Sequence, residues 1–396
     1  MLGWEFPPYS SGGLGTACYG LIKGLSNRGV DVSLVLPVKY ESKLDFVRII
    51  PSGDLRLTTT KVNSSLFAYA TPSSYKSAVG VFHNSDSIYG GDLFEEVYRY
   101  SKKVEEIAKN EDYDVIHCHD WMTFIAGINA KRISKKPLVV HVHATEFDRT
   151  AGLGVNQLVY DIERRGMHAA DAIIAVSNFT KGKIIEHYGV HKDKILVVHN
   201  AVDFNDNHHY EGFEIKDSYK IVLFLGRITI QKGPDYFLYA ARRVLEYEPN
   251  VLFVIAGSGD MEAQIIEKAA ELGISDRVLF AGFLKGEDVD RAYKMADLYV
   301  MPSVSEPFGI TPLEAMRNNT PVIISKQSGV SEVINHCLKV DFWDINEMSN
   351  MIISVLRYGE LRECLGRNGF FEVKKFNWDE PAEKCISLYN NLLGVV

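Results

Sequence analysis

The chain repeats one pattern, in which short β-branched apolar runs alternate with segments of helical spacing. Continuous apolar runs between helices are typical of parallel strands that are buried on both faces. Five runs lie in the first half and five in the second: 30–36, 115–119, 138–143, 172–176, 195–199, 221–226, 251–257, 278–281, 298–301 and 321–325. Each set predicts one doubly wound sheet, so we expect an α/β protein.

The length of 396 residues predicts two large domains, since about 150 residues is usual for one. The polar, aperiodic stretch 205–217 has the character of a linker. We therefore expect a first domain over residues 1–202 and a second over 203–375. Residues 41–90, with strand-like pieces at 46–50 and 66–70, read as an elaboration of the first domain. The amphipathic segment 378–393 need not belong to the second sheet.

Composition excludes several classes of protein. Apolar residues make up 46% and charged residues 24%, and no run reaches the roughly 18 apolar residues of a membrane span, so we expect a soluble protein. The five scattered cysteines form no Cys-x-x-Cys pair, which favours a reducing cytoplasm over a disulfide framework or zinc ribbon. The amino end shows no signal peptide. Its first apolar stretch, 1–4, is short for a strand, so we expect a late start site or a clipped chain.

The charge distribution argues against nucleic acid as a partner. Residues 1–200 carry 23 Lys and Arg against 22 Asp and Glu, which leaves 20 against 29 of the totals of 43 and 51. Binding to a phosphate backbone needs a concentrated basic surface. The basic run at 131–136 could touch an anionic membrane, but a solvated turn is the favoured interpretation.

The segment 303–316 places two carboxylates eight residues apart where a loop enters a helix. Thr311, Pro312 and Glu314 fit the N-cap, first and third helical positions. The amides of Phe308, Gly309 and Ile310 would then lie near a positive helix end, which suits an anion or a polyhydroxylated ligand. A plain capping box also explains Glu314, but it gives no reason for Glu306 in the loop.

Other polar groups follow the predicted strands, and ligands of open parallel sheets bind at the carboxyl ends of strands. Arg227 and Lys232 stand five residues apart after the strand at 221–226, a spacing that suits a diphosphate. Gly12 and Gly13 follow the first strand, where bare backbone can approach a phosphate or merely allow tight packing. Gly257-Ser258-Gly259 is a lone Gly-x-Gly, which is poor evidence of a dinucleotide site, so we expect it only to form part of the wall of the site.

Histidines end two strands of the first half, in His117-Cys118-His119-Asp120 and His141-Val142-His143. His141 and His143 share one face, which raises the possibility of zinc. No downstream Cys or His cluster completes a ligand set, so we expect no metal. His143, the last strand residue, is the better candidate for a polar role.

Taken together, Gly12-Gly13, His143, Arg227 with Lys232, and Glu306 with Glu314 resemble the retaining glycosyltransferases of family 4 and their glycogen synthase relatives. His119-Asp120-Trp121 and Trp4-Glu5-Phe6-Pro7 point to the glucan synthase branch. The resemblance implies a GT-B fold, in which two Rossmann-like doubly wound domains face a central cleft, and a final helix, 376–396, that returns to the first domain.

The resemblance also implies roles. Arg227 and Lys232 would hold the diphosphate of a nucleotide sugar and stabilise its departing charge, with Gly12 and Gly13 closing over it. Glu306 and the amides of 308–310 would bind sugar hydroxyls, and Glu314 the ribose. His143, Asp120 and Asn200 would orient the transferred sugar, and neither a metal nor a cofactor would be needed.

The expected activity is glucosyl transfer from ADP- or UDP-glucose to an α-glucan, with retention. One departure is that Ser10-Ser11-Gly12-Gly13-Leu14 lacks the lysine of the usual Lys-x-Gly-Gly-Leu motif. The alternatives are transfer of another hexose to a lipid or small acceptor and, from other classes, a nucleotide-sugar epimerase or a metal-dependent hydrolase that uses His141 and His143. The base, sugar, acceptor, linkage and oligomeric state stay open.

Overall fold

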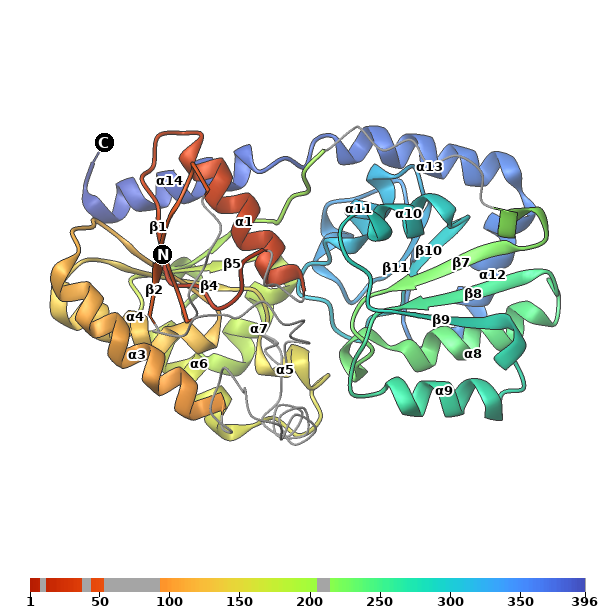
Figure 1. The fold of residues 1–396 in the computed structure, drawn as a ribbon, viewed down its shortest axis with the longest axis horizontal. Coiled ribbons are helices and arrows are strands. Elements are labelled where there is room, and N and C mark those ends of the chain that lie inside the picture. Colours follow the sequence, from red (N-terminus) through yellow and green to blue (C-terminus); the bar gives the residue numbers. More distant parts are fainter. Residues whose placement is uncertain (8–11, 38–43, 53–92, 205–213, 396) are drawn as a thin grey trace. The chain divides into compact units, whose positions relative to one another are not determined.

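The computed structural model describes residues 1–7, 12–37, 44–52, 93–204 and 214–395. The chain forms two compact units (Figure 1). Unit 1 comprises Met1–Phe147, Gly154–Asn200 and Trp378–Val396, and unit 2 comprises Asp148–Leu153 and Ala201–Asn377. The strand-like piece expected at 66–70 and most of the expected linker lie outside the described residues.

Unit 1 is built on a parallel sheet. Its strands β3 to β6 follow one another in the order β3-β4-β5-β6, and β1 pairs in parallel with β2. Leu2 lies between the two groups, because it forms parallel bridges to Val35 of β1 and to Cys118 of β3. The strands are β1 Ser33–Leu36, β2 Arg48–Pro51, β3 Ile116–His119, β4 Leu138–Val142, β5 Ala172–Ala175 and β6 Ile195–Val197.

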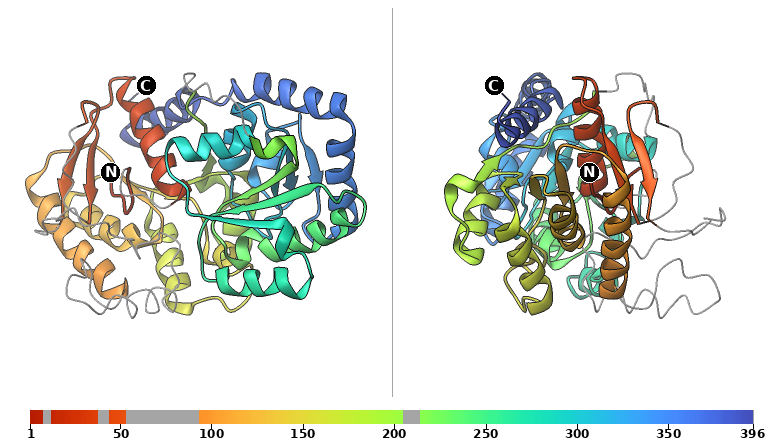
Figure 2. Two further views of the ribbon diagram at one scale, coloured as in Figure 1. Left: turned by 45° about the vertical axis from the view of Figure 1, so that its right-hand side comes forward. Right: turned by 90° about the vertical axis from the view of Figure 1, so that its left-hand side faces the viewer.

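Helices cover both faces of this sheet (Figures 1 and 2). Helices α1 and α14 pack side by side on one face, whereas α3, α4 and α6 pack together on the other. Gly20 and Gly24 of α1 permit this contact, since a Cβ on either would lie within 2.6 Å of Trp378 atoms. The helices are α1 Gly13–Ser26, α3 Leu93–Asn110, α4 Trp121–Ser134, α5 Glu146–Arg149, α6 Gln157–Ala169, α7 Asn178–Tyr188, η1 Lys192–Lys194 and α14 Asp379–Leu393.

Unit 2 has one six-stranded parallel sheet in the order β12-β11-β10-β7-β8-β9. The order runs outward in both directions from the β10–β7 pair, which is the arrangement of a doubly wound fold with a topological switch point beside β7. The strands are β7 Lys220–Leu225, β8 Val251–Ala256, β9 Val278–Gly282, β10 Leu298–Met301, β11 Val322–Ser325 and β12 Leu338–Val340.

The core of unit 2 lies between this sheet and helices α8, α9 and α12, which bury aliphatic and aromatic side chains such as Phe237, Ile265 and Ile352. Helices α10 and α11 lie on the opposite face (Figure 1). The helices are η2 Glu214–Asp217, η3 Ile230–Lys232, α8 Pro234–Leu245, α9 Glu262–Glu271, η4 Ser275–Arg277, α10 Glu287–Met295, α11 Thr311–Arg317, η5 Gly329–Glu332, α12 Ile345–Arg357 and α13 Gly359–Val373.

The predicted α/β class with two parallel sheets is confirmed, and each of the ten predicted strands is present. Strand β12 was not predicted, because its three residues include Lys339 and give no apolar run. Among the described residues, no helix has both the length and the apolar character that crossing a membrane requires.

Unit 1 also contains a cavity of about 880 Å³. Its lining includes the amino ends of β1 and β3, at Ser33 and Ile116, together with Val104 of α3 and Leu393 of α14. The predicted site residues follow the opposite, carboxyl ends of the strands. This cavity is therefore not the candidate site.

Candidate functional site

Arg227 and Lys232 lie in the loop after β7, beside the switch point of the unit 2 sheet. Lys232 ends the short helix η3, and Gly233 follows it with φ of 63°. A Cβ at Gly233 would stand 2.4 Å from the carbonyl oxygen of Pro302, in the loop after β10. Glycine is therefore what allows the Lys232 loop to press against the loop that carries Glu306.

Two further glycines support this loop from the β8 side. A Cβ at Gly257 would stand 1.8 Å from the Gly226 carbonyl oxygen, and one at Gly259 would stand 2.2 Å from that of Ile228. The Ile228 amide donates to the Ser258 carbonyl at 3.0 Å. Gly257-Ser258-Gly259 thus packs against the backbone of residues 226 and 228, on either side of Arg227 in the sequence.

Gln231 connects the two strand-end loops and was missed in the sequence. Its side-chain oxygen accepts a hydrogen bond from Arg227 Nη2 at 2.9 Å. Its carbonyl oxygen accepts from the amides of Val304 at 2.9 Å and Ser305 at 3.4 Å. Only 2% of Gln231 is exposed, although a polar residue between cations in a loop reads as solvated.

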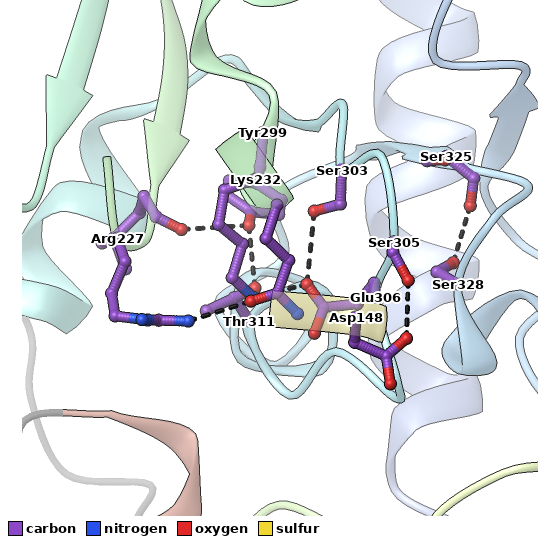
Figure 3. A network of polar contacts seen from close by, with 12 residues as sticks. Asp148, Arg227, Lys232, Tyr299, Ser303, Ser305, Glu306, Thr311, Ser325 and Ser328 are labelled. Carbon is purple, nitrogen blue, oxygen red and sulfur yellow. Dashed lines mark hydrogen bonds and ion pairs between the residues drawn. The ribbon is translucent and has the colours of Figure 1, made fainter. Parts of the chain in front are cut away.

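Glu306 meets Lys232 directly (Figure 3). Lys232 Nζ lies 2.5 Å from Glu306 Oε2, and Ser303 Oγ donates to the same oxygen at 3.2 Å. The Glu306 backbone is fixed as well, because its amide donates to Gln327 and its carbonyl accepts from Gly329, both at 2.9 Å. With 6% exposure, Glu306 is a buried carboxylate held by a cation from another loop. This pair joins the ends of β7 and β10.

The helix after Glu306 begins one residue earlier than predicted. Helix α11 spans Thr311–Arg317 with Ile310 at its N-cap, and no side chain caps it, so the predicted Thr311 capping box is wrong. Thr311 instead accepts a hydrogen bond from Tyr299 OH at 2.8 Å, and Glu314 accepts one from Tyr293 OH at 3.1 Å. Tertiary partners on α10 and β10 therefore replace the local cap. A capping box therefore does not explain Glu314.

Buried surroundings favour the protonated form of the second carboxylate, Glu314. Burial raises the pKa of Glu314, and Arg317 and the Tyr293 hydroxyl oppose that rise only in part. Gly309 lies between the two acids with φ of 100°, and a Cβ there would contact Glu306 Cγ at 3.1 Å. Phe308 and Ile310 are 2% and 8% exposed, so this turn is tightly packed.

Ser305 makes another contact of unit 2 that the sequence did not suggest. Its hydroxyl donates to Asp148 Oδ1 at 2.6 Å, and Asp148 is fully buried (Figure 3). The segment Asp148–Leu153 belongs to unit 2, although the sequence analysis placed it within the first domain. The composition of this six-residue segment does not indicate that it belongs to unit 2.

In unit 1, Asp120 organises the end of β4. Its Oδ1 accepts from the amide of His143 at 2.7 Å and from that of Ala144 at 3.3 Å. Asp120 is fully buried with φ of 59° and ψ of 169°, a conformation that costs about 1–3 kcal/mol and that clusters at functional sites. Asp120 thus positions the backbone that carries His143.

His143 belongs to a group of four buried histidines on adjacent strands, which we call the histidine cluster: His117, His119, His141 and His143. His143 stacks on His141 with ring centroids 4.2 Å apart, and its Nε2 lies 3.0 Å from His119 Nδ1. Burial lowers the pKa of His143 to about 3. Its ring is therefore neutral at physiological pH and offers a hydrogen bond without a charge.

Gly12 and Gly13 behave differently from the packing glycines of α1. Gly12 caps α1 in an extended conformation and Gly13 begins the helix. Among the described residues, no atom lies within 4 Å of a Cβ built at either position, so these residues give no packing reason for glycine here. Asn200, which follows β6, is 8% exposed. These residues lie in unit 1 with Asp120 and His143.

The basic run after α4 is neutralised locally. Lys131 Nζ lies 2.8 Å from Asp171, Arg132 lies 3.5 Å from Glu105, and Lys136 lies 3.7 Å from Asp114. Three of the four cations of the run thus have an acidic neighbour in unit 1. This pattern favours the solvated turn over a surface for anionic lipid.

Comparison with family models places both halves among sugar-transferring enzymes. Residues 11–206 match the model described as Glycosyltransferase Family 4, and residues 207–371 match that of Glycosyl transferases group 1. An uncharacterized glycosyltransferase of Methanocaldococcus jannaschii is 32% identical over 98% of this chain and 97% of its own. The glycogen synthase of Mycobacterium tuberculosis is 26% identical, over 84% of this chain and 79% of its own.

Two solved structures show the same fold. Sucrose-phosphate synthase of Thermosynechococcus elongatus aligns with a TM-score of 0.77 and 21% identity, over 100% of this chain and 96% of its own. Anabaena HepE in complex with UDP-glucose aligns with a TM-score of 0.70 and 18% identity, over 98% and 99%. Likeness at this level of identity concerns the fold, and it confirms the predicted GT-B class of two Rossmann-like domains.

Proposed function

The chain belongs to glycosyltransferase family 4, and on that premise we propose that it transfers a glucosyl unit from ADP- or UDP-glucose to an α-glucan, with retention at the anomeric carbon. The observation that carries the proposal is the contact of Lys232 with Glu306, which brings a cation and a buried acid together at the switch point. Arg227 follows the same strand as Lys232. Two cations and two acids at one sheet edge suit a molecule that is anionic at one end and hydroxylated at the other.

Unit 2 supplies the proposed donor-binding groups. Arg227 offers planar donors that can engage two phosphate oxygens, and Lys232 adds a compact charge. Both would stabilise negative charge on the departing diphosphate, a type of effect whose loss costs about 10²–10³-fold in rate. Glu306 would accept hydrogen bonds from sugar hydroxyls beside the amides of 308–310. Glu314, whose raised pKa reflects burial, would contact the ribose.

Unit 1 supplies the proposed groups for the transferred sugar. The neutral ring of His143 can exchange hydrogen bonds with a hydroxyl, and Asp120 holds the His143 amide at 2.7 Å. Asn200 adds a second neutral polar group. Gly12 and Gly13, around which the described part of the chain puts no atom within 4 Å of a Cβ, would approach the diphosphate through bare backbone. Because Arg227 and Lys232 provide the positive charge, we propose that transfer needs no metal ion.

A donor and acceptor screen tests this function. The protein is incubated with radiolabelled ADP-glucose or UDP-glucose and glycogen, with and without a chelator, and label in the polymer is counted. We expect polymer labelling that survives the chelator and is lost in Glu306→Ala. Release of nucleoside diphosphate without polymer gain would refute the glucan acceptor. Full activity of Glu306→Ala would refute the proposed site, and loss of polymer labelling with chelator would refute metal-independent transfer. Chelator-sensitive hydrolysis without polymer labelling would favour the hydrolase alternative.

A second candidate is transfer of a hexose to a small acceptor. It is favoured by the D-inositol 3-phosphate glycosyltransferase of Mycolicibacterium smegmatis, which is 30% identical over 71% of this chain and 68% of its own. Adding inositol phosphate, fructose 6-phosphate or glucose in place of glycogen decides between the two. Labelled small product without labelled polymer would establish the second candidate. Conversion of the donor with no acceptor present would instead indicate an epimerase.

A further inference from the structure

The histidine cluster lies in the core of unit 1 together with a thiol. Cys18 of α1, His119 of β3 and His143 at the end of β4 each offer one ligand atom, and these three atoms lie within 4.8 Å of one another. All three residues are buried, with exposures of 1%, 0% and 5%. They come from three elements that are distant in the sequence, so no linear motif records them.

Hydrogen bonds within the cluster leave ring nitrogens unsatisfied. His117 Nε2 lies 3.2 Å from His141 Nδ1, and His117 Nδ1 lies 2.5 Å from Tyr389 OH. In the part of the chain that is described, the Nε2 atoms of His119 and His141 are buried and have no hydrogen-bond partner. An orphaned buried polar atom costs about 1–3 kcal/mol. Such atoms are rare in folded proteins and often mark an ion or a water.

The local charge favours a cation over a water. Asp120 directly follows His119 in the chain, is fully buried, and its carboxylate accepts a hydrogen bond from the His143 amide at 2.7 Å. A divalent cation would offset the negative charges of a Cys18 thiolate and of the Asp120 carboxylate.

We propose that Cys18, His119 and His143 form a binding site for a zinc-like divalent cation. Imidazole and thiolate ligands suit Zn²⁺, whereas Mg²⁺ prefers oxygen ligands. Tetrahedral bonding at the usual Zn–N and Zn–S lengths separates ligand atoms by about 3.3–3.6 Å. From a spacing within 4.8 Å, the ligand atoms therefore need to close by about 1.5 Å or less. The fourth position would be taken by water. Because His143 also has a proposed role toward the sugar, the cation is expected to be a modulator and not a requirement for transfer.

Direct metal binding tests the site without any turnover, so the result is independent of the proposed transferase activity. The metal-free protein is titrated with Zn²⁺ against a chromophoric chelator, and with Co²⁺ while the near-ultraviolet sulfur-to-metal band is followed. We expect one equivalent of Zn²⁺, a Co²⁺ thiolate band, and no competition from Mg²⁺. Cys18→Ala should abolish the band and weaken Zn²⁺ binding at least ~10-fold.

Two matched controls separate this site from other thiols. Cys118→Ala removes a buried thiol from β3, but its sulfur faces Gly127 of α4 on the other side of the sheet. Cys364→Ser removes an exposed thiol of unit 2. Both controls should keep the band and the affinity. Should Cys18→Ala fail to fold, as judged by thermal unfolding, the less disruptive Cys18→Ser replaces it. Absence of a bound equivalent in the wild type, or equal loss in Cys118→Ala, would overturn the proposal.

Discussion

Both units place polar side chains at equivalent positions, after the strands of a parallel sheet. The histidine side chains of unit 1 are uncharged, whereas the side chains of unit 2 include an ion pair. In unit 1 the histidine cluster is buried, stacked and neutral. In unit 2, Lys232 forms an ion pair with Glu306, and 21% of the Lys232 side chain is exposed. Burial without a counter-charge removes a titratable charge, whereas burial beside an opposite charge retains it. The same topology therefore yields one site suited to neutral hydroxyls and one suited to an anion.

Acidification should lower the folding stability of unit 1 before that of unit 2, and this is the largest effect that we expect. Burial lowers the pKa of all four cluster histidines below the value near 6.5 of an unfolded chain. As the pH falls below 6.5, these histidines bind protons in the unfolded state but not in the folded state. Each histidine then removes about 1.4 kcal/mol of stability per pH unit, or roughly 5 kcal/mol for four. Hydrogen-exchange protection of β3 and β4 in chelated protein measures this loss.

Unit 2 is the internal control for that experiment. The pKa of Glu314 is raised, so its folded form binds a proton more tightly than the unfolded form, and its contribution has the opposite sign over the acidic range. Strands β7 and β8 should therefore keep their protection to lower pH than β3 and β4. Simultaneous loss of protection in both units would contradict the contrast between them.

Replacing Lys232 with methionine tests whether the charged site of unit 2 depends on this cation. The change keeps the apolar stem but removes the charge that meets Glu306 and, as proposed, the diphosphate. We expect kcat/KM to fall by about 10²–10³-fold, which corresponds to about 3–4 kcal/mol. Lys326→Met is the matched control, because Lys326 also pairs with an acid in unit 2 but has a 53% exposed side chain. Equal losses in both variants would show that general charge, and not this position, matters.

Gly233→Ala should disturb the contact between the two loops of unit 2. Its backbone has φ of 63°, and the added Cβ would stand 2.4 Å from the Pro302 carbonyl oxygen. Gly273→Ala is a control with the same strain, since φ is 68° and no atom of the described residues lies within 4 Å of a Cβ there. Left-handed backbone alone costs about 1–2 kcal/mol, and overpacking adds about 1–3 kcal/mol. Denaturant unfolding should rank Gly233→Ala as the more destabilised; equal values would rule out the clash.

Glu314→Gln should have the smallest effect, and its sign should differ between stability and activity. The amide can still accept from Tyr293 OH and carries no buried charge, so stability at neutral pH should hold or rise slightly. Loss of the proposed ribose contact should raise the KM for the nucleotide sugar by about 2–10-fold, the value of one hydrogen bond. The KM for the acceptor should not change. An unaffected donor KM, with the exposed Glu363→Gln as reference, would remove Glu314 from the donor site.

Periodicity alone predicted ten parallel strands and two sheets, because strands buried on both faces must be apolar throughout. Strand-end chemistry also followed from the sequence, since parallel strands all end at one edge and their next residues must lie there. Arg227, Lys232, Glu306 and His143 were located in this way. Local rules failed where tertiary partners intervened, as at Thr311, whose hydroxyl bonds to Tyr299 instead of capping its helix.

The sequence by itself thus determined the layers of each unit and which polar residues stand at the strand ends. Only the tertiary structure decided how these residues are paired. Glu306 contacts Lys232 at a sequence separation of 74 residues, and Cys18 lies close to His119 and His143 of other elements. The reason is physical: periodicity reports which face of an element is buried, whereas charge state and partner depend on the few ångströms between elements that are remote along the chain.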